Sequence, residues 1–248
     1  MYIWKCWRNS RARFVIYLIL VSMVCALVIA MTARFGAPVY SLKGSPVIRV
    51  PGLWVFGGRS VLGGGLAVIM LFGALSLGAG VIGEEFKEQT LWFLFTLPRP
   101  RRVWVWASWL SGGCELLVVI LAAVVGMFVG LIYLSGYVYT WRLLAAVLPL
   151  FVGALAIYTT AFFLTAASRS GENGFTWGTG ILFIDLLLPL ALRYWHFKIS
   201  SVLDVMHDGC AWAVGPASAF PWRLVIICVV LTCALLLGTQ VLIERREV

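Results

Sequence analysis

Charged side chains are scarce in this sequence. Asp, Glu, Lys and Arg make up 12% of its 248 residues, and 62% of the residues are hydrophobic. Soluble domains carry roughly a quarter charged and about half apolar residues, and their surfaces need dispersed charge. A soluble protein is therefore excluded. The 25 glycines and 12 tryptophans suit close helix packing in lipid and aromatic belts at the membrane interface.

The sequence also lacks the patterns that indicate catalysis, metal binding or nucleotide binding. It has two histidines and six cysteines, and no two cysteines form a Cys-x-x-Cys pair. His207, Asp204, Asp208 and Cys210 lie close together in a loop, which is more typical of a surface than of a metal site. No arrangement indicates a hydrolase, and no Gly-Lys-Ser/Thr turn forms a P-loop. We expect no catalytic residue, no metal and no cofactor bound by this chain.

The net charge of +9 does not indicate a nucleic-acid-binding protein. Such proteins concentrate Lys and Arg on one soluble face. Here the basic residues stand singly or in short groups between apolar runs, as membrane-flanking residues do. We expect membrane lipid as a partner and no nucleic acid.

Apolar runs bounded by charged residues predict an all-α polytopic membrane protein with six spans, forming one domain over residues 1–248. The first run lies between Arg13 and Arg34 and has about the 20 residues that a span needs; it is too long for a cleaved signal sequence. The other five are bounded as follows: Arg59 to Glu84, Arg102 to Arg142, Leu143 to Ser168, Glu172 to Arg193 (interrupted by Asp185 and Pro189), and Leu224 to Ile243.

An even number of spans places both termini on one side of the membrane. With that side inside, the inner connections carry more Lys and Arg than the outer ones, and Lys5, Arg8, Arg11 and Arg13 form a dense basic group before the first span. Because Lys and Arg favour the cytoplasmic side and the first helix usually dominates, we predict a multi-pass cell-membrane protein with both termini cytoplasmic. The long outer loop, residues 194–222, has Val202 and Met206 at helical spacing, and is either re-entrant or a surface cap.

The inner connection at residues 84–102 has an acidic start, an apolar middle and a proline stop at Pro98. The third span is unusually long: from Val103 to Leu134 a helix measures about 48 Å, whereas the hydrocarbon needs about 30 Å. The first turns of this span should therefore lie in the headgroup region or the cytosol.

Within that connection, Glu85, Thr90, Leu91, Pro98 and Arg101 have a spacing that resembles the permeases of the type-2 ABC exporter superfamily. The resemblance implies that residues 84–102 form a coupling helix that docks on a separate ATPase. The residues implied in coupling are Glu84, Glu85, Lys87, Glu88, Thr90, Leu91, Pro98, Arg99, Arg101 and Arg102.

The N-terminal residues 1–13 resemble the amphipathic elbow of the same superfamily, with Trp4, Trp7, Arg8, Arg11 and Arg13 as its marked positions. The resemblance further implies two copies of an ATP-binding subunit, which would hold ATP and Mg, and a second permease subunit in a homodimer or heterodimer. The chain itself would not be an enzyme.

Two carboxylates lie inside predicted spans, Glu115 and Asp185. Intramembrane carboxylates are costly and often functional, so both are candidates for a transport pathway, although Glu115 could instead reach the headgroups. Two other functions stay open. One is an ion-gradient-driven secondary transporter, which would need more intramembrane charge or interrupted helices in matched halves; the other is a non-transporting assembly or anchor subunit.

Overall fold

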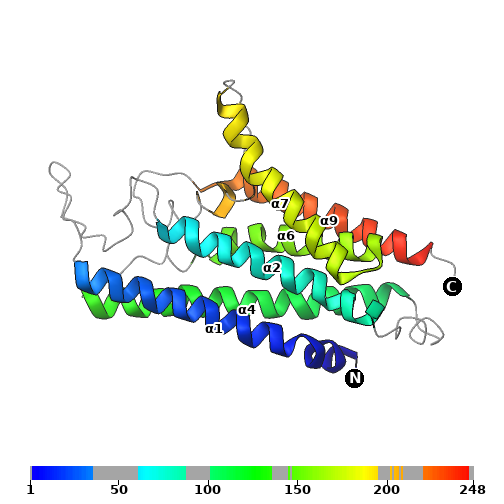
Figure 1. The fold of residues 1–248 in the computed structure, drawn as a ribbon, viewed down its shortest axis with the longest axis horizontal. Helices are drawn as coiled ribbons and strands as arrows, with labels where there is room; N and C mark the ends of the chain where they lie inside the picture. The colour runs from blue at the N-terminus through cyan, green and yellow to red at the C-terminus, as the bar shows by residue number, and fades with distance from the viewer. Residues whose placement is uncertain are drawn as a thin grey trace.

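The computed structural model describes residues 2–35, 61–87, 101–135, 145, 147–194, 202, 204–206, 208 and 220–245. These residues form six long helices: α1 (Tyr2–Phe35), α2 (Val61–Lys87), α4 (Arg101–Ser135), α6 (Val147–Ser168), α7 (Gly171–Tyr194) and α9 (Trp222–Glu244). The described part of the chain contains no strand, which confirms the all-α class. The helices lie roughly along one direction, except α7, which diverges from the others toward its C-terminal end (Figure 1).

Five of these helices are long and apolar enough to cross a membrane: α1, α2, α4, α6 and α9. The chain is thus a multi-pass membrane protein. The helix α7 is not among the five; its side chains are described without a gap only over residues 171–185, a stretch shorter than a span. Its 24 residues measure about 36 Å, which is long enough for a span. The sixth span therefore stays a prediction.

Both termini lie at the same end of the bundle (Figure 1). We call this the N/C end: α1 begins there, α9 ends there, α2 ends and α4 begins there, and α6 turns into α7 there. This arrangement agrees with an even number of traversals. Residues 2–13 of the predicted elbow belong to the continuous helix α1, and the separate role of the elbow stays a prediction.

The centre of the bundle is the pair α2 and α6, which pack along each other. Tyr158 and Phe162 of α6 and Met70, Leu71 and Leu75 of α2 are among the largest fully buried side chains. Small residues permit the close approach: a side chain at Gly78 of α2 would collide with the backbone carbonyl of Tyr158. Close packing replaces the hydrophobic driving force that lipid does not supply.

The helices also present apolar side chains outward, as a lipid-facing surface requires. Met23 of α1 is 65% exposed, Trp177 of α7 is 67% exposed, and Ile227 of α9 is 61% exposed. Pro149 lies in the first turn of α6, where its missing N–H has no partner to lose. By contrast, Pro189 lies inside α7, and the helix continues through it.

Part of the predicted outer loop 194–222 folds back onto the bundle. Val205 and Met206 are buried; Met206 contacts α6 at Gly153, and Val205 packs with Val225 and Cys228 of α9. These two residues therefore belong to the packed protein interior. Whether the loop dips into a membrane leaflet stays a prediction.

Candidate functional site

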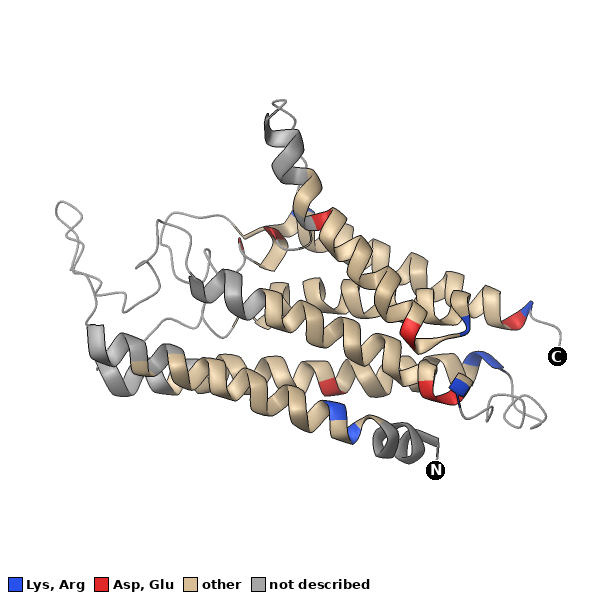
Figure 2. Ribbon diagram, in the orientation of Figure 1, with Lys and Arg blue, Asp and Glu red and all other residues tan. Residues whose placement is uncertain are grey.

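Most charged residues of the described chain gather at the N/C end of the bundle (Figure 2). They come from the N-terminal third of α1, the first turn of α4, the last turns of α2 and α9, and the α6–α7 turn: Arg11, Arg13, Glu84, Glu85, Lys87, Arg101, Arg102, Arg169, Glu172, Glu244 and Arg245. This end also holds both helices that flank the predicted coupling connection. We therefore take it as the candidate functional site.

Arg13 of α1 forms an ion pair with Glu84 of α2. The two side chains are 34% and 30% exposed, so water screens the pair only in part. Gly80 provides the space, because a Cβ there would overlap the Arg13 guanidinium. Since Glu84 lies one turn before the end of α2, the pair joins α1 to the last described turn before the predicted coupling helix.

Glu115 of α4 is 5% exposed and accepts a hydrogen bond through its Oε1 atom from the Ser10 hydroxyl of α1. Its Oε2 atom is buried and has no hydrogen-bond partner among the described residues. Arg13, one turn beyond Ser10, interacts electrostatically with Glu115. Glu115 thus faces α1 inside the bundle, and its role in a transport pathway or at the headgroups stays a prediction.

Ser10 and Arg13 are three residues apart, so they share one face of α1. Through them α1 contacts both helices that flank the predicted coupling helix, α2 at Glu84 and α4 at Glu115. The sequence marks Arg13, Glu84 and Glu115 for separate reasons. Ser10 carries no such mark, and its spacing from Arg13 is the one signal that could have indicated it.

The register of α1 on α2 is set one turn farther on, at Tyr17. Its ring lies on Gly73, where any Cβ would overlap the ring, and its hydroxyl donates a hydrogen bond to the Ile69 carbonyl at 3.2 Å. Gly73 and Gly80 are two turns apart on α2, and Tyr17 and Arg13 are one turn apart on α1. The later residue of α1, Tyr17, thus packs on the earlier glycine of α2, Gly73, and Arg13 packs on Gly80, as expected for two antiparallel helices.

The start of α4 is held against α6. The Trp109 indole N–H donates to the Thr159 hydroxyl at 2.9 Å, and the Tyr158 hydroxyl donates to the Trp109 carbonyl at 3.1 Å. Gly112 lies beneath the Tyr158 ring. The whole helix has 35 residues and measures about 52 Å, so it exceeds the hydrocarbon thickness, as the sequence predicts.

The predicted coupling residues are only partly described. Lys87 and Arg102 are exposed at the N/C end, whereas Glu85 is 2% exposed and points into the bundle. Arg101 is half-buried and approaches the Ile243 carbonyl of α9. Glu88, Thr90, Leu91, Pro98 and Arg99 lie outside the described residues.

Among the predicted elbow residues, Arg13 is paired as above and Arg11 is exposed. The side chains of Trp4, Trp7 and Arg8 lie outside the description.

Asp185, the second predicted pathway carboxylate, lies far from this site, in the C-terminal half of α7. It is half-buried, and its Oδ2 atom accepts a hydrogen bond from the Val202 backbone N–H at 3.0 Å. One role of Asp185 is therefore to hold the segment around Val202, Val205 and Met206 against the bundle. The structure does not bring Asp185 together with Glu115.

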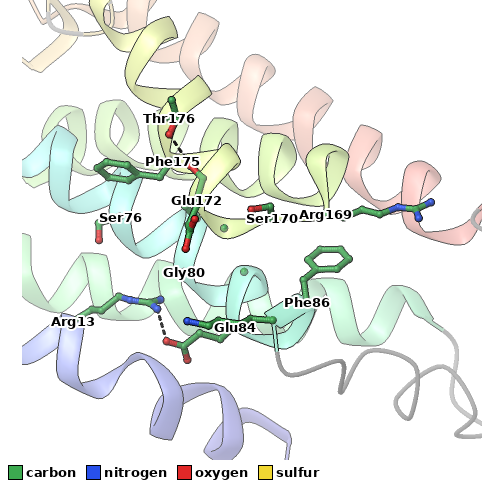
Figure 3. A pocket seen from close by; sticks show the side chains of 14 residues that line it. Arg13, Ser76, Gly80, Glu84, Phe86, Arg169, Ser170, Glu172, Phe175 and Thr176 are labelled. Atoms are coloured by element: carbon green, nitrogen blue, oxygen red, sulfur yellow. Dashed lines mark hydrogen bonds and ion pairs between the residues drawn. The ribbon is translucent and has the colours of Figure 1, made fainter.

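A cavity of about 670 Å³ opens beside the Arg13–Glu84 pair (Figure 3). Its lining comes from Arg13 of α1, the last three turns of α2, the α6–α7 turn and the first turns of α7. Within the described residues, no group of three or more His, Cys, Asp and Glu side chains is placed to hold a metal ion.

No protein-family model matches the chain, and no curated protein matches it in sequence.

Proposed function

We propose that this chain is the membrane-spanning permease subunit of an ATP-driven exporter, and that it couples to a separate ATPase through the connection between α2 and α4. The proposal rests on the spacing of Glu85, Thr90, Leu91, Pro98 and Arg101. It draws support from the length of α4 and from the charged N/C end, where both flanking helices of that connection meet.

The structural observation that supports the coupling route is the double attachment of α1. Arg13 binds the last described turn of α2 before the connection, and Ser10 binds α4 after it. A force on the connection would therefore reach α1 through two short polar contacts, and α1 would carry it along the bundle. Movement of one rigid helix against its neighbours is a common way to transmit a switch.

Coupling is tested by placing an acidic residue on the exposed surface of this end. Arg102→Glu reverses a charge at the start of α4, and Arg223→Glu reverses a matched exposed charge at the start of α9, at the opposite end of the bundle. The chain is purified from its native membrane, and co-purified ATPase is identified by ATP photolabelling and measured as ATP hydrolysis. We expect Arg102→Glu to lower both and Arg223→Glu to change neither.

Two other results would contradict the proposal and identify its alternatives. Transport by the purified chain in ATP-free vesicles, driven by an ion gradient, would make it a secondary transporter. A stable complex in which Arg102→Glu changes assembly but leaves flux intact would make it an assembly or anchor subunit.

A further inference from the structure

The cavity lies in a groove on α2 between two helices that do not pack against each other. Both α1 and α7 pack on α2, and no packed α1–α7 interface forms in the described part of the chain. The floor of the groove consists of small residues on one face of α2: Ser76, Ala79, Gly80 and Gly83. From Ser76 to Lys87 the lined stretch of α2 measures about 16 Å, so the cavity is elongated along the bundle.

Both signs of charge line the cavity. Lys87 and Arg169 are cationic and Glu172 is anionic, and none of the three has an ion-pair partner among the described residues. In Figure 3, Glu172 extends from α7 over Gly80, whereas the guanidinium of Arg169 is directed away from Glu172 along the rim. Arg13 and Glu84 also line the cavity, but they neutralise each other. The charges left for a ligand are therefore the carboxylate of Glu172 and the cations of Lys87 and Arg169, all three of them exposed.

The size and position of the cavity limit the ligand. Its volume of about 670 Å³ falls within the range of about 300–1,000 Å³ that is typical of small-molecule sites. It occupies the ends of membrane-spanning helices, where phospholipid headgroups are the most abundant molecules. Phe86 and Phe175 also line it, and their rings suit the apolar region just below a headgroup.

We propose that this cavity binds the headgroup of a membrane aminophospholipid, which carries one phosphate and one primary ammonium. Lys87 contacts the phosphate, because a Lys ammonium is a compact point charge that binds phosphate oxygens. Glu172 accepts hydrogen bonds from the lipid ammonium.

The mixture of charges distinguishes this ligand from other membrane lipids. A purely anionic headgroup would be attracted by Lys87 but repelled by Glu172, which gains no partner from it. A choline headgroup satisfies the charge of Glu172, but its quaternary ammonium has no N–H to donate. The arrangement therefore selects a primary amine together with a phosphate.

The test uses the full-length chain with whatever subunits co-purify. The protein is delipidated, then exchanged into nanodiscs with equal amounts of phosphatidylethanolamine, phosphatidylglycerol and phosphatidylcholine, and retained lipid is counted by native mass spectrometry. We expect preferential retention of phosphatidylethanolamine. Glu172→Gln should lower that preference about tenfold, as the loss of one charge-assisted contact does, and Lys87→Gln should weaken retention of both phosphatidylethanolamine and phosphatidylglycerol.

Two further variants separate site effects from general ones. Thr176→Trp fills the cavity from α7 without changing charge, and should abolish retention of all three lipids. Glu244→Gln removes an exposed carboxylate at the same end but outside the cavity, and should change nothing. A variant is compared only if its thermal midpoint is unchanged and it elutes as a single size-exclusion peak. If the charge variants fail to fold, lipid retention by Thr176→Trp tests the site instead.

Equal retention of the three lipids, or an unchanged preference in Glu172→Gln, would overturn the proposal. Displacement of the lipid by water-soluble phosphoethanolamine at comparable concentration would assign the same chemistry to a soluble ligand instead. A disulfide between two copies carrying Thr176→Cys that excludes lipid would assign the groove to a second copy of the chain. Because lipid retention needs no ATPase, each of these results leaves the proposed transport function standing.

Discussion

The Ser10 hydroxyl of α1 donates a hydrogen bond to the Glu115 carboxylate of α4, across 105 residues of sequence. Both residues are buried, and Arg13 stands one turn away with its charge on the same side. The carboxylate is thus held by a neutral donor and a nearby cation. The N-terminal part of α1 is thereby tied to the helix that follows the predicted coupling connection.

Replacement of Glu115 should reveal this attachment in the stability of the protein. In Glu115→Ala, Ser10 loses its acceptor and a cavity forms, so we expect a loss of about 1–3 kcal/mol. In Glu115→Gln, the amide oxygen still accepts from Ser10, and most of the stability should remain. Thermal unfolding in detergent measures both.

Cys114→Ala, an exposed neighbour on the same helix, is the control and should unfold like the wild type. Equal losses in Glu115→Ala and Glu115→Gln would contradict the hydrogen bond and assign the effect to charge. If Glu115 instead lines a transport pathway, Glu115→Gln should reduce flux while leaving the unfolding temperature in place.

Two glycines should respond to the same substitution with opposite signs. A Cβ at Gly73 would overlap the Tyr17 ring, whereas a Cβ at Gly126 would meet nothing within 4 Å. We expect Gly73→Ala to lower the thermal midpoint, because a rigid ring cannot move aside without separating α1 from α2. Gly126→Ala should leave the midpoint unchanged or raise it, since Ala favours a helix over Gly by about 1 kcal/mol. A neutral Gly73→Ala would show that α1 does not approach α2 this closely.

The Arg13–Glu84 pair should contribute little free energy of unfolding. Because both side chains are about one-third exposed, a double-mutant cycle of Arg13→Gln and Glu84→Gln should give a coupling energy below about 1 kcal/mol. The coupling should also fall as salt is added. A value several times larger, or one independent of salt, would mean that the pair is buried in the membrane-embedded protein.

Removal of the Asp185 carboxylate should loosen the segment that follows α7. Asp185→Ala deprives the Val202 N–H of its acceptor, so we expect faster hydrogen exchange and faster proteolysis around Val202, Val205 and Met206. Asp185→Asn keeps an oxygen acceptor and should show a smaller effect. Glu244→Ala, an exposed change at the other end of the bundle, serves as the control. Unchanged exchange in Asp185→Ala would contradict the attachment and leave a transport role as the better account.

The sequence by itself predicted that the chain is helical and multi-pass, and it placed most helix ends within a few residues. The run between Leu143 and Ser168 became α6, Val147–Ser168, and the run between Leu224 and Ile243 became α9, Trp222–Glu244. These predictions depend on local properties, since a span is recognised by the length of an uncharged stretch. The count of six stays open at α7, whose side chains are described without a gap only over residues 171–185.

Which faces of the helices meet is visible only in the folded bundle. In a membrane protein both the lipid-facing surface and the interior are apolar, so periodicity does not separate them as it does in a soluble helix. The sequence could mark Glu115 as an unusual carboxylate, but not that Ser10 would bind it. Nor could it show that Gly80 makes room for Arg13 beside Glu84, because these contacts depend on the register and rotation of α1 against two helices far from it in the chain.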